Sequence, residues 1–447
     1  MNSTWEIDSW KKFPAAQQPD WPDQAEYEAV LKEMSTYPAL VYVNEIKELQ
    51  AALSLAAQGK AFLLQAGDCA ESFSDHSAQT IRNKLKVILQ MAVVLTYSTG
   101  VPVIKVGRIA GQYAKPRSSP TEKYGDLELP AFRGHIVNSE QLDESSRIPD
   151  PKRMIHAYHQ SGSTLNLIRS LTQGGFADLS KVHTWTQEFV RSSSEGQRYE
   201  AVAFEIERAL RFMAACGIDL SKEQVLQQVK FWTSHESLLL GYESALTRQD
   251  PSSGKWYDLS AHSIWIGERT RDLNGAHMEF ASGIANPLGC KIGPTTTKDQ
   301  IVEICEKLNP NRIPGRLTLI SRMGAGKITE VLPPLVSAVK NEGHPVLWAC
   351  DPMHGNTFNA AGTGLKTRRF DEILLELQGF FQVHKSLNSW PGGVHIELTG
   401  EDVTECLGGA EEIFEHELDI NYNSICDPRL NGRQSLDLAY RIAEMLI

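Results

Sequence analysis

Eight short aliphatic runs, most of them separated by amphipathic helical stretches, predict an α/β fold that closes into a (β/α)8 barrel. Strands that alternate with helices form parallel sheets, and eight such units are the number that closes a barrel. The predicted strands are Ala61–Gln65, Pro102–Val106, Val229–Thr233, Ser263–Ile266, Pro287–Ile292, Leu317–Ser321, Val346–Ala349 and Val394–Leu398. A doubly wound open sheet is the alternative, but the chain contains neither the G-x-G-x-x-G nor the P-loop pattern that would favour it.

The helical stretches predict an insertion within this barrel. The windows that fit helices after strands include Thr80–Val94, Asp299–Lys307, Val331–Asn341 and Phe370–Phe381. The second and third predicted strands lie roughly 120 residues apart, whereas a simple strand–helix–strand unit takes about 30. Helical segments near Pro151–Leu171 and Gln197–Cys216 occupy this gap. We therefore expect a catalytic barrel over residues 51–447 with an inserted regulatory or interface region at about 150–220.

The first 50 residues differ from the rest of the chain. Aromatic residues and prolines alternate with polar residues from Trp5 to Pro22, and a helix is predicted near Gln24–Ser35. Disordered tails are usually poor in aromatic residues, so the pattern favours an extended arm that packs on a surface over a disordered tail. We therefore assign residues 1–50 to an arm and helix that form an interface.

Composition excludes several classes of function. The 447 residues are 41% hydrophobic and 22% charged, with a formal net charge of -11 and a pI of about 5.7. An acidic chain is a poor ligand for nucleic acid, and no apolar run is long enough to span a membrane. The segment Met1–Asp20 lacks the apolar core of a signal peptide, and seven scattered cysteines form no disulfide pattern. We therefore expect reduced thiols and a cytoplasmic location.

Potential metal ligands follow several of the predicted strands. The active site of a parallel barrel is built at the C-terminal ends of its strands. Cys69, His354 and Glu397 fall there, and Asp427 lies in a later loop. One thiolate, one imidazole and two carboxylates suit Mn²⁺, Fe²⁺, Co²⁺ or Zn²⁺ better than Mg²⁺. Their wide separation in the sequence leaves an alternative open, since an isolated cysteine is more often a small buried hydrophobic residue.

Cationic side chains occupy the same strand ends. They are Arg108, Lys115, Arg117, Arg269, Lys291 and Arg322. Arginine binds phosphate or carboxylate through two parallel hydrogen bonds, and lysine is a compact charge that also transfers protons. Such a group would repel itself without an anionic ligand, so two anionic substrates, or one with both phosphate and carboxylate, are predicted. Glu268 could orient Arg269 or a bound water. For each cation alone, a solvated surface charge is the alternative.

The segments that carry these residues closely resemble the class II 3-deoxy-D-arabino-heptulosonate 7-phosphate (DAHP) synthases. They run in order through Gly-Asp-Cys-Ala-Glu at 67–71, the block at 105–118, Trp-Ile-Gly-Glu-Arg-Thr-Arg at 265–271, the block at 286–294, Ser-Arg-Met-Gly at 321–324, Cys-Asp-Pro-Met-His-Gly-Asn at 350–356, the block at 392–400 and Cys-Asp-Pro-Arg-Leu-Asn at 426–431. The resemblance covers nearly the whole chain, and it favours a metal site over four unrelated residues.

The resemblance implies a transferase that condenses phosphoenolpyruvate with D-erythrose 4-phosphate and water, the entry step of the shikimate pathway to chorismate and the aromatic amino acids. It implies one divalent ion, Mn²⁺ or Co²⁺ with Fe²⁺, Zn²⁺ or Cd²⁺ as alternatives, bound by Cys69, His354, Glu397 and Asp427. It assigns phosphoenolpyruvate to Arg108, Glu268, Arg269, Lys291 and Arg322, and erythrose 4-phosphate to Lys115, Arg117 and Ser118. The expected catalytic residues are Lys291, which could protonate the aldehyde oxygen, Glu268, which could orient water, and the ligands Cys69 and His354.

The arm and the inserted helices resemble the longer form of this family. That form implies a homodimer or homotetramer and feedback inhibition by Trp, Phe or Tyr, with a chorismate mutase as a further partner. Two alternatives concern function. One is a related synthase of secondary metabolism (phenazine or amino-shikimate) or one with another aldose phosphate. The other is a non-catalytic regulator, which the presence of all four ligands disfavours.

Overall fold

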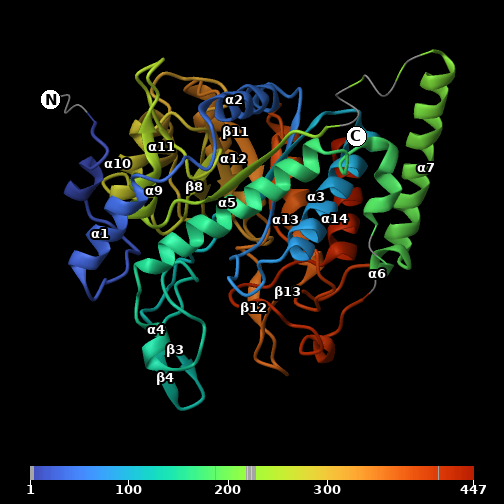
Figure 1. Cartoon of the computed structure of the whole chain (residues 1–447). Helices are drawn as coiled ribbons and strands as arrows, with labels where there is room; N and C mark the ends of the chain where they lie inside the picture. Colours follow the sequence, from blue (N-terminus) through green and yellow to red (C-terminus); the bar gives the residue numbers. More distant parts are fainter. Residues whose placement is uncertain (1–4, 187, 218, 220–222, 224–227, 411) are drawn as a thin grey trace.

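Eight parallel strands close into a barrel in the computed structural model, which describes residues 5–186, 188–217, 219, 223, 228–410 and 412–447 (Figure 1). The strands are β1 (Phe62–Gly67), β2 (Val103–Arg108), β5 (Phe231–Glu236), β8 (Ser263–Ile266), β9 (Leu288–Ile292), β10 (Leu317–Ser321), β11 (Leu347–Cys350) and β14 (Gly393–Glu397). Each pairs with the next barrel strand along the chain, and β14 closes onto β1. All eight predicted strands are confirmed, and the largest difference at an end is three residues, at Glu236.

Helices cover the outside of the barrel. Those that follow the strands in order are α3 (Ala78–Thr99), α5 (Lys152–Gln173), α9 (Leu240–Leu246), α10 (Ala276–Gly283), α11 (Lys298–Leu308), α12 (Ile328–Asn341), α13 (Phe370–Ser386) and α14 (Gly432–Leu446). Helix α2 (Val43–Ala57) closes the N-terminal end, where Leu49 and Leu53 pack against Leu63 and Trp232. None of the described helices is long and apolar enough to cross a membrane.

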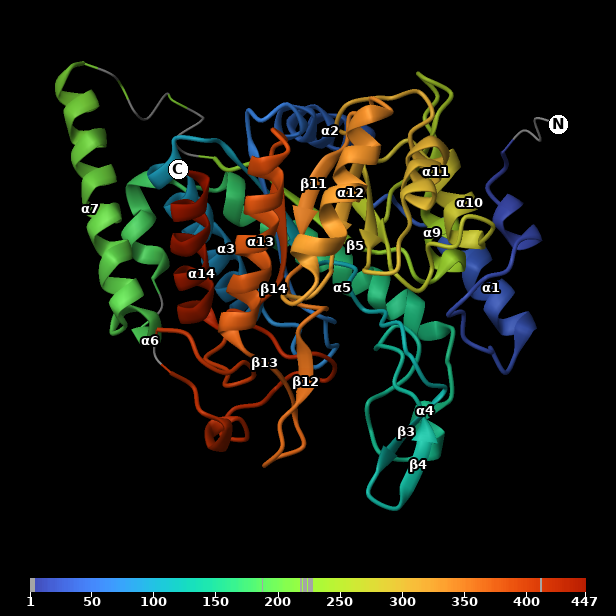
Figure 2. The same cartoon turned by 180° about the vertical axis from the view of Figure 1, so that it is seen from behind.

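Two hairpins extend from the opposite end of the barrel from α2 (Figure 2). They are β3 (Thr121–Tyr124) with β4 (Leu127–Pro130), and β12 (Thr357–Asn359) with β13 (Lys366–Arg368). A third hairpin joins β6 (Thr247–Gln249) to β7 (Trp256–Asp258), and the 3-10 helix η4 spans Glu415–Glu417. The first two hairpins carry residues of the candidate site, and neither was predicted from the sequence.

The predicted insertion between the second and third barrel strands is present. After the β3–β4 hairpin it contains α4 (Glu144–Arg147), α5, the 3-10 helix η2 (Leu179–Trp185), α6 (Glu188–Arg191) and α7 (Ser194–Ala215). Helix α7 lies alongside α3 and α14 at one side of the barrel (Figure 2). Residues 187, 218 and 220 of the predicted insertion lie outside the described residues.

The N-terminal arm packs on the outer helices α9 and α10. It contains the 3-10 helix η1 (Ser9–Lys12) and is followed by α1 (Gln24–Met34). The indole nitrogen of Trp5 donates to the carbonyl oxygen of Glu279 at 3.0 Å, and that of Trp10 donates to Oγ of Ser244 at 2.7 Å. The aromatic residues of this segment therefore contact the barrel, while the boundary expected at residue 50 falls inside α2.

Candidate active site and metal centre

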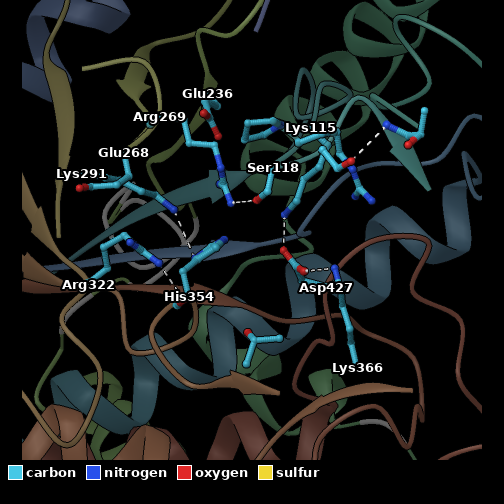
Figure 3. Close-up of a pocket in the computed structure, with 16 residues that line it drawn as sticks. Lys115, Ser118, Glu236, Glu268, Arg269, Lys291, Arg322, His354, Lys366 and Asp427 are labelled. Carbon is cyan, nitrogen blue, oxygen red and sulfur yellow. Dashed lines mark hydrogen bonds and ion pairs between the residues drawn. The ribbon is translucent and has the colours of Figure 1, made fainter. Parts of the chain in front are cut away.

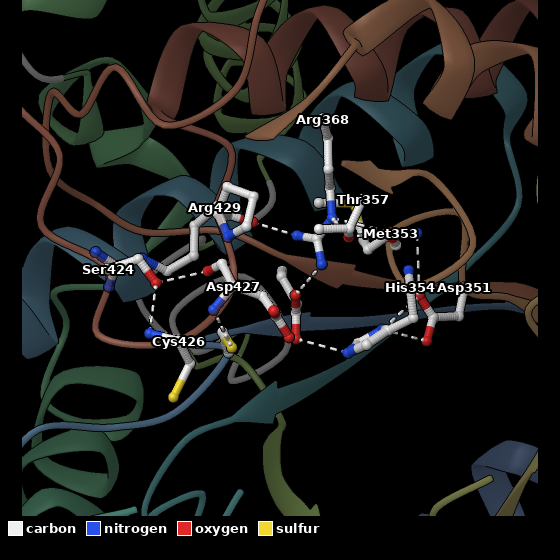
Figure 4. A network of polar contacts seen from close by, with 12 residues as sticks. Asp351, Met353, His354, Thr357, Arg368, Ser424, Cys426, Asp427 and Arg429 are labelled. Atoms are coloured by element: carbon white, nitrogen blue, oxygen red, sulfur yellow. Dashed lines mark hydrogen bonds and ion pairs between the residues drawn. The ribbon is translucent and has the colours of Figure 1, made fainter. Parts of the chain in front are cut away.

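Three side chains from separate strand ends and one from a later loop come together at the C-terminal mouth of the barrel. Figure 4 shows two of the four, His354 and Asp427, within one network of polar contacts. Cys69 follows β1, His354 follows β11, Glu397 ends β14 and Asp427 precedes α14. One donor atom each from Cys69, Glu397 and Asp427 lies within 4.8 Å of the other two, and Nε2 of His354 lies 3.1 Å from Oε1 of Glu397. A thiolate, an imidazole and two carboxylates in this arrangement fit a divalent ion of borderline softness.

Glu397 is fully buried and is held by two guanidinium groups. Nη2 of Arg108 donates to its Oε1, and Nη2 of Arg368 donates to its Oε2, each at 2.8 Å. Burial opposes ionisation, but the electrostatic interactions with His354 and Arg368 hold the pKa of the Glu397 carboxyl well below its usual range. Glu397 is therefore an oriented carboxylate, which is the form that binds metal.

Asp351 orients the imidazole of His354. With the proton on Nδ1, His354 donates to Oδ2 of Asp351 at 2.8 Å, and Nε2 is left to face Glu397. Nζ of Lys291 donates to the same Oδ2 at 2.8 Å. Burial opposes ionisation of Asp351, but His354 and Lys291 hold the pKa of that carboxyl well below its usual range. A carboxylate at the far nitrogen of a histidine fixes the ring for metal binding.

Lys115 places a positive charge among the same donors. Its Nζ lies 2.5 Å from Oδ2 of Asp427 and 3.0 Å from Sγ of Cys69. Burial disfavours this ammonium, but Asp427 and Cys69 raise the pKa of Lys115 well above its usual value. The oxygen and sulfur atoms thus lie close enough together to share one cation, as a metal site requires.

A cavity of about 270 Å³ opens beside this cluster (Figure 3). Its cationic lining residues are Lys115, Arg117, Arg269, Lys291, Arg322 and Lys366, and its carboxylates are Glu236, Glu268 and Asp427. Positive side chains thus outnumber carboxylates in a chain whose formal net charge is -11. Cations that converge on a cleft attract anionic substrates and bind their phosphate groups.

Seven of the eight predicted substrate-binding side chains line this cavity. They are Lys115, Arg117, Ser118, Glu268, Arg269, Lys291 and Arg322. The eighth, Arg108, is buried near the metal donors, where it contacts Glu397 and lies 5.0 Å from the ring of Trp265. Arg108 does not belong to the cavity lining in the part of the chain that the structure describes. Its contact with phosphoenolpyruvate therefore stays a prediction.

Hydrogen bonds order the rim of the cavity. Nη2 of Arg269 donates to Oγ of Ser118 at 2.6 Å. Oε1 of Glu268 accepts from Arg271 at 2.7 Å, so Glu268 orients Arg271 rather than Arg269. Its Oε2 has no hydrogen-bond partner within the described part of the chain. This buried carboxylate oxygen is thus able to accept a hydrogen bond from a substrate or a water.

Three residues that contact the candidate metal ligands were not predicted from the sequence. Asp351 stands three positions before His354, and this spacing is a local signal that could have identified it. Arg368 and Lys366 belong to β13, where nothing in the local sequence indicates that they reach Glu397 and Asp427. Their contacts depend on how the β12–β13 hairpin folds over the mouth.

Glu376 of α13 ties together two loops of the site. Its Oε1 accepts from the backbone N–H groups of Met323 and Gly324 at 2.7 and 2.9 Å, and its Oε2 accepts from the side chain of Asn356 at 2.7 Å. Burial raises its pKa from 4.5 to about 7. A carboxyl with a raised pKa in the folded state binds a proton more tightly there than in the unfolded chain. Its stabilising contribution to the free energy of unfolding is therefore fully present below pH 4.5 and is lost as the pH rises through 7.

Glu376→Gln is therefore expected to remove part of the pH dependence of stability. Between pH 4.5 and 7.5 the free energy of unfolding of the wild type should fall by on the order of 3 kcal/mol more than that of the variant. Denaturant unfolding of both proteins across this range measures the difference. Glu372→Gln, on the same helix, is the control. Parallel pH profiles for the wild type and Glu376→Gln would rule out a buried titrating carboxyl at this position.

The closed parallel barrel and the site at its C-terminal mouth define the class of protein. It is a barrel enzyme in which potential metal ligands lie beside a cation-lined cavity for small anionic substrates. The chain belongs to the Class-II DAHP synthetase family, whose model matches residues 5–443. It is 56% identical over 437 residues to a phospho-2-dehydro-3-deoxyheptonate aldolase of Streptomyces coelicolor, covering 98% of this chain and 96% of the relative. It is 51% identical over 446 residues to the phospho-2-dehydro-3-deoxyheptonate aldolase AroG of Mycolicibacterium smegmatis, covering 98% and 94%. A solved phospho-2-dehydro-3-deoxyheptonate aldolase structure from Francisella tularensis matches with a TM-score of 0.49 and 13% identity, covering 96% of this chain and 98% of that one.

Proposed function

We propose that this enzyme condenses phosphoenolpyruvate with D-erythrose 4-phosphate and water to give DAHP and inorganic phosphate, the first step of the shikimate pathway. The observation that carries the proposal is the cavity in which six cationic side chains adjoin the donor cluster of Cys69, Glu397 and Asp427, with His354 in contact with Glu397. Two phosphorylated substrates need this excess of positive charge to lie side by side. Family membership and the names of the two curated relatives support the same reaction.

The two substrates occupy different parts of the cavity in this proposal. Lys291, Arg322 and Glu268 lie at the ends of β9, β10 and β8, and they bind phosphoenolpyruvate. Arg269 belongs with these phosphoenolpyruvate residues, whereas Lys115, Arg117 and Ser118 bind the phosphate of the aldose. The hydrogen bond between Ser118 and Arg269 joins the two subsites. Holding both reactants at once removes part of the entropic barrier to the reaction.

The reaction forms one carbon–carbon bond and one carbon–oxygen bond to water, and it breaks the carbon–oxygen bond to the phosphate. C3 of phosphoenolpyruvate attacks the aldehyde carbon, and Nζ of Lys291 gives a proton to the aldehyde oxygen. Water adds to C2 with Oε2 of Glu268 orienting it, and phosphate leaves with the C2 oxygen. One proton of the water leaves with the phosphate, and the other restores the ammonium form of Lys291. Cys69, His354, Glu397 and Asp427 would hold one divalent ion, which would supply Lewis acidity for the attack on the aldehyde. These donors suit Mn²⁺ or Co²⁺, and Fe²⁺, Zn²⁺ and Cd²⁺ fit the same set.

Consumption of phosphoenolpyruvate with a panel of aldehydes tests the proposed substrates. The absorbance of the enol is followed with erythrose 4-phosphate, with other aldose phosphates, and with unphosphorylated erythrose. We expect turnover with erythrose 4-phosphate and little with erythrose, because Lys115 and Arg117 would lack a phosphate to bind. Preference for another aldose phosphate would assign the chain to a neighbouring pathway, and no turnover with any aldehyde would favour a non-catalytic role.

We propose that an aromatic amino acid, Trp, Phe or Tyr, binds in a second cavity and inhibits the enzyme. This cavity of about 870 Å³ lies between the barrel and α3, α5 and η2, and apolar residues such as Leu89, Val93 and Trp185 line it. Lys105 is a partly buried lining residue of this cavity, and burial lowers its pKa to about 8. Its ammonium group is suited to the effector carboxylate, and Glu45 to the effector amine.

Lys105→Met is expected to weaken inhibition by the aromatic amino acid about tenfold, because a charge-assisted hydrogen bond to the carboxylate is lost. The inhibition constant is measured for each of the three amino acids in the wild type and the variant. Lys181→Met is the control, since Nζ of Lys181 donates to the carbonyl oxygen of Gly175 at 2.7 Å beside this cavity. Inhibition constants that are equal in Lys105→Met and the wild type would exclude Lys105 from the effector site.

We further propose that the chain is a homodimer or homotetramer in the cytoplasm and that α7 forms part of the interface between copies. Phe204 and Phe212 of α7 are 56% and 69% exposed. Large apolar side chains exposed on a single helix are typical of subunit contacts. Sedimentation equilibrium of the full chain determines the number of copies, and repeating it with a chorismate mutase tests the further partner that the family resemblance implies.

A further inference from the structure

The N-terminal arm contacts the loop of the active-site cavity through Gln17. The backbone N–H of Arg117 donates to Oε1 of Gln17 at 2.8 Å, and Nε2 of Gln17 donates to the carbonyl oxygen of Arg117 at 3.0 Å. One side-chain amide thus pairs with both backbone groups of a single residue, as a neighbouring strand would. A residue of the arm is thereby bonded to a residue that lines the cavity.

The arm on either side of Gln17 is itself fixed to the barrel. The backbone N–H of Ala276, at the start of α10, donates to the carbonyl oxygen of Pro14 at 2.9 Å. Nε2 of Gln18 donates to the carbonyl oxygen of Leu238 at 2.7 Å, just after β5. Gln17 is therefore presented to the loop by a segment that is anchored before and after it.

The backbone of Gln17 adopts a conformation that its residue type disfavours. Its φ angle is 64°, in the left-handed region that glycine occupies at little cost and other residues avoid. Such strain persists only where the surroundings determine it. The two hydrogen bonds to Arg117 supply a reason for a glutamine at this position.

The loop that Gln17 holds carries the predicted subsite for the aldose phosphate. It runs from the end of β2 to β3 without regular secondary structure and presents Lys115, Arg117 and Ser118 to the cavity. The guanidinium of Arg117 forms an ion pair with Glu122. The position of the Arg117 backbone thus sets where the side chains of Arg117 and Ser118 reach the cavity.

We infer that Gln17 is a positioning residue for the subsite that binds the phosphate of the aldose substrate. The inference rests on the proposed function and extends it, because it makes the arm part of the active site as well as a packing segment. Gln17 acts through the backbone of Arg117 and touches no reacting atom. Its loss should therefore impair use of erythrose 4-phosphate while leaving the phosphoenolpyruvate subsite intact.

Gln17→Gly tests this inference, because glycine relieves the backbone conformation and removes only the side-chain amide. We expect the KM for erythrose 4-phosphate to rise about tenfold while the KM for phosphoenolpyruvate and the melting temperature change little. Ser9→Ala is the matched control. It removes another arm contact, from Oγ of Ser9 to Oε1 of Glu279 at 2.9 Å, without touching the loop. Gln17→Leu, which keeps the size of the side chain, should reproduce the effect.

A double-mutant cycle with Arg117→Ala distinguishes positioning of Arg117 by Gln17 from a general loosening of the arm. If Gln17 acts through Arg117, Gln17→Gly should raise the KM much less in the Arg117→Ala background than in the wild type. Equal effects in both backgrounds, or equal rises in the KM of both substrates, would overturn the inference.

The affinity for inorganic phosphate provides a readout that does not depend on the reaction. Gln17→Gly should lower this affinity about tenfold. If the wild type does not turn over the proposed substrates, the proposed function fails, and unchanged phosphate affinity in Gln17→Gly would then overturn the inference separately.

Discussion

Cys69→Ala is expected to lower turnover at least about a thousandfold, because metal activation of an aldehyde contributes several kcal/mol to catalysis. Sγ of Cys69 lies within 4.8 Å of donor atoms of Glu397 and Asp427 and accepts from Lys115 at 3.0 Å. Alanine removes the one soft donor of the set and leaves the Lys115 ammonium opposite two carboxylates. The remaining ligands should favour Mg²⁺ relatively more than they do in the wild type.

Turnover and metal content of the same preparations check this prediction. Cys305→Ala is the control, since Cys305 is a buried cysteine on α11, packed in the core away from the strand ends. Cys305→Ala should retain turnover and one metal ion per chain. A loss of stability that comes only from removing a buried thiol should appear in both Cys305→Ala and Cys69→Ala. A Cys69→Ala protein that holds a full equivalent of metal and turns over normally would show that Cys69 is a packing residue.

Lys291→Met should lower kcat by about a hundred- to ten-thousandfold, the range that a positioned general acid contributes. Burial lowers the pKa of Lys291, so its ammonium gives up a proton more readily than an exposed lysine does. Asp351 holds Nζ at 2.8 Å, and the side chain lines the cavity beside His354. Methionine keeps the length of the side chain and removes both the charge and the proton.

Separate measurement of kcat and of the KM for each substrate distinguishes the two roles assigned to Lys291. A fall in kcat that persists at saturating phosphoenolpyruvate is the expected result. Lys340→Met, at the end of α12, controls for the loss of one positive charge. Near-normal kcat with only a raised KM for phosphoenolpyruvate would limit Lys291 to binding and assign the proton to another group.

The barrel and the contents of its mouth could be predicted because both follow from local patterns. Each strand is a short aliphatic run, and a closed parallel barrel brings every strand end to one face. Cys69, His354 and Glu397 therefore meet although hundreds of residues separate the first from the last, and the loop before α14 adds Asp427. For the same reason Lys291, Arg322 and Glu268 line one cavity, although their spacing in the sequence gives no sign of it.

Contacts between loops could not be predicted in this way. The pairing of Glu268 with Arg271, the burial of Arg108 against Glu397 and the reach of Arg368 all depend on side-chain directions at the mouth. Local sequence does not encode which of two arginines, one and three positions after a carboxylate, pairs with it. Gln17 is the clearest example, because its role depends on a loop that lies far from it in the sequence.

Phosphate release from phosphoenolpyruvate during a metal titration tests whether this site carries out a metal-dependent condensation. Protein stripped by a chelator is refilled stepwise with Mn²⁺ or Co²⁺, and release is measured with and without erythrose 4-phosphate. We expect release only when both the aldehyde and the metal are present, rising to a plateau at one equivalent of metal per chain. Equal release from stripped protein, or release that needs no aldehyde, would contradict a metal-dependent condensation at this site.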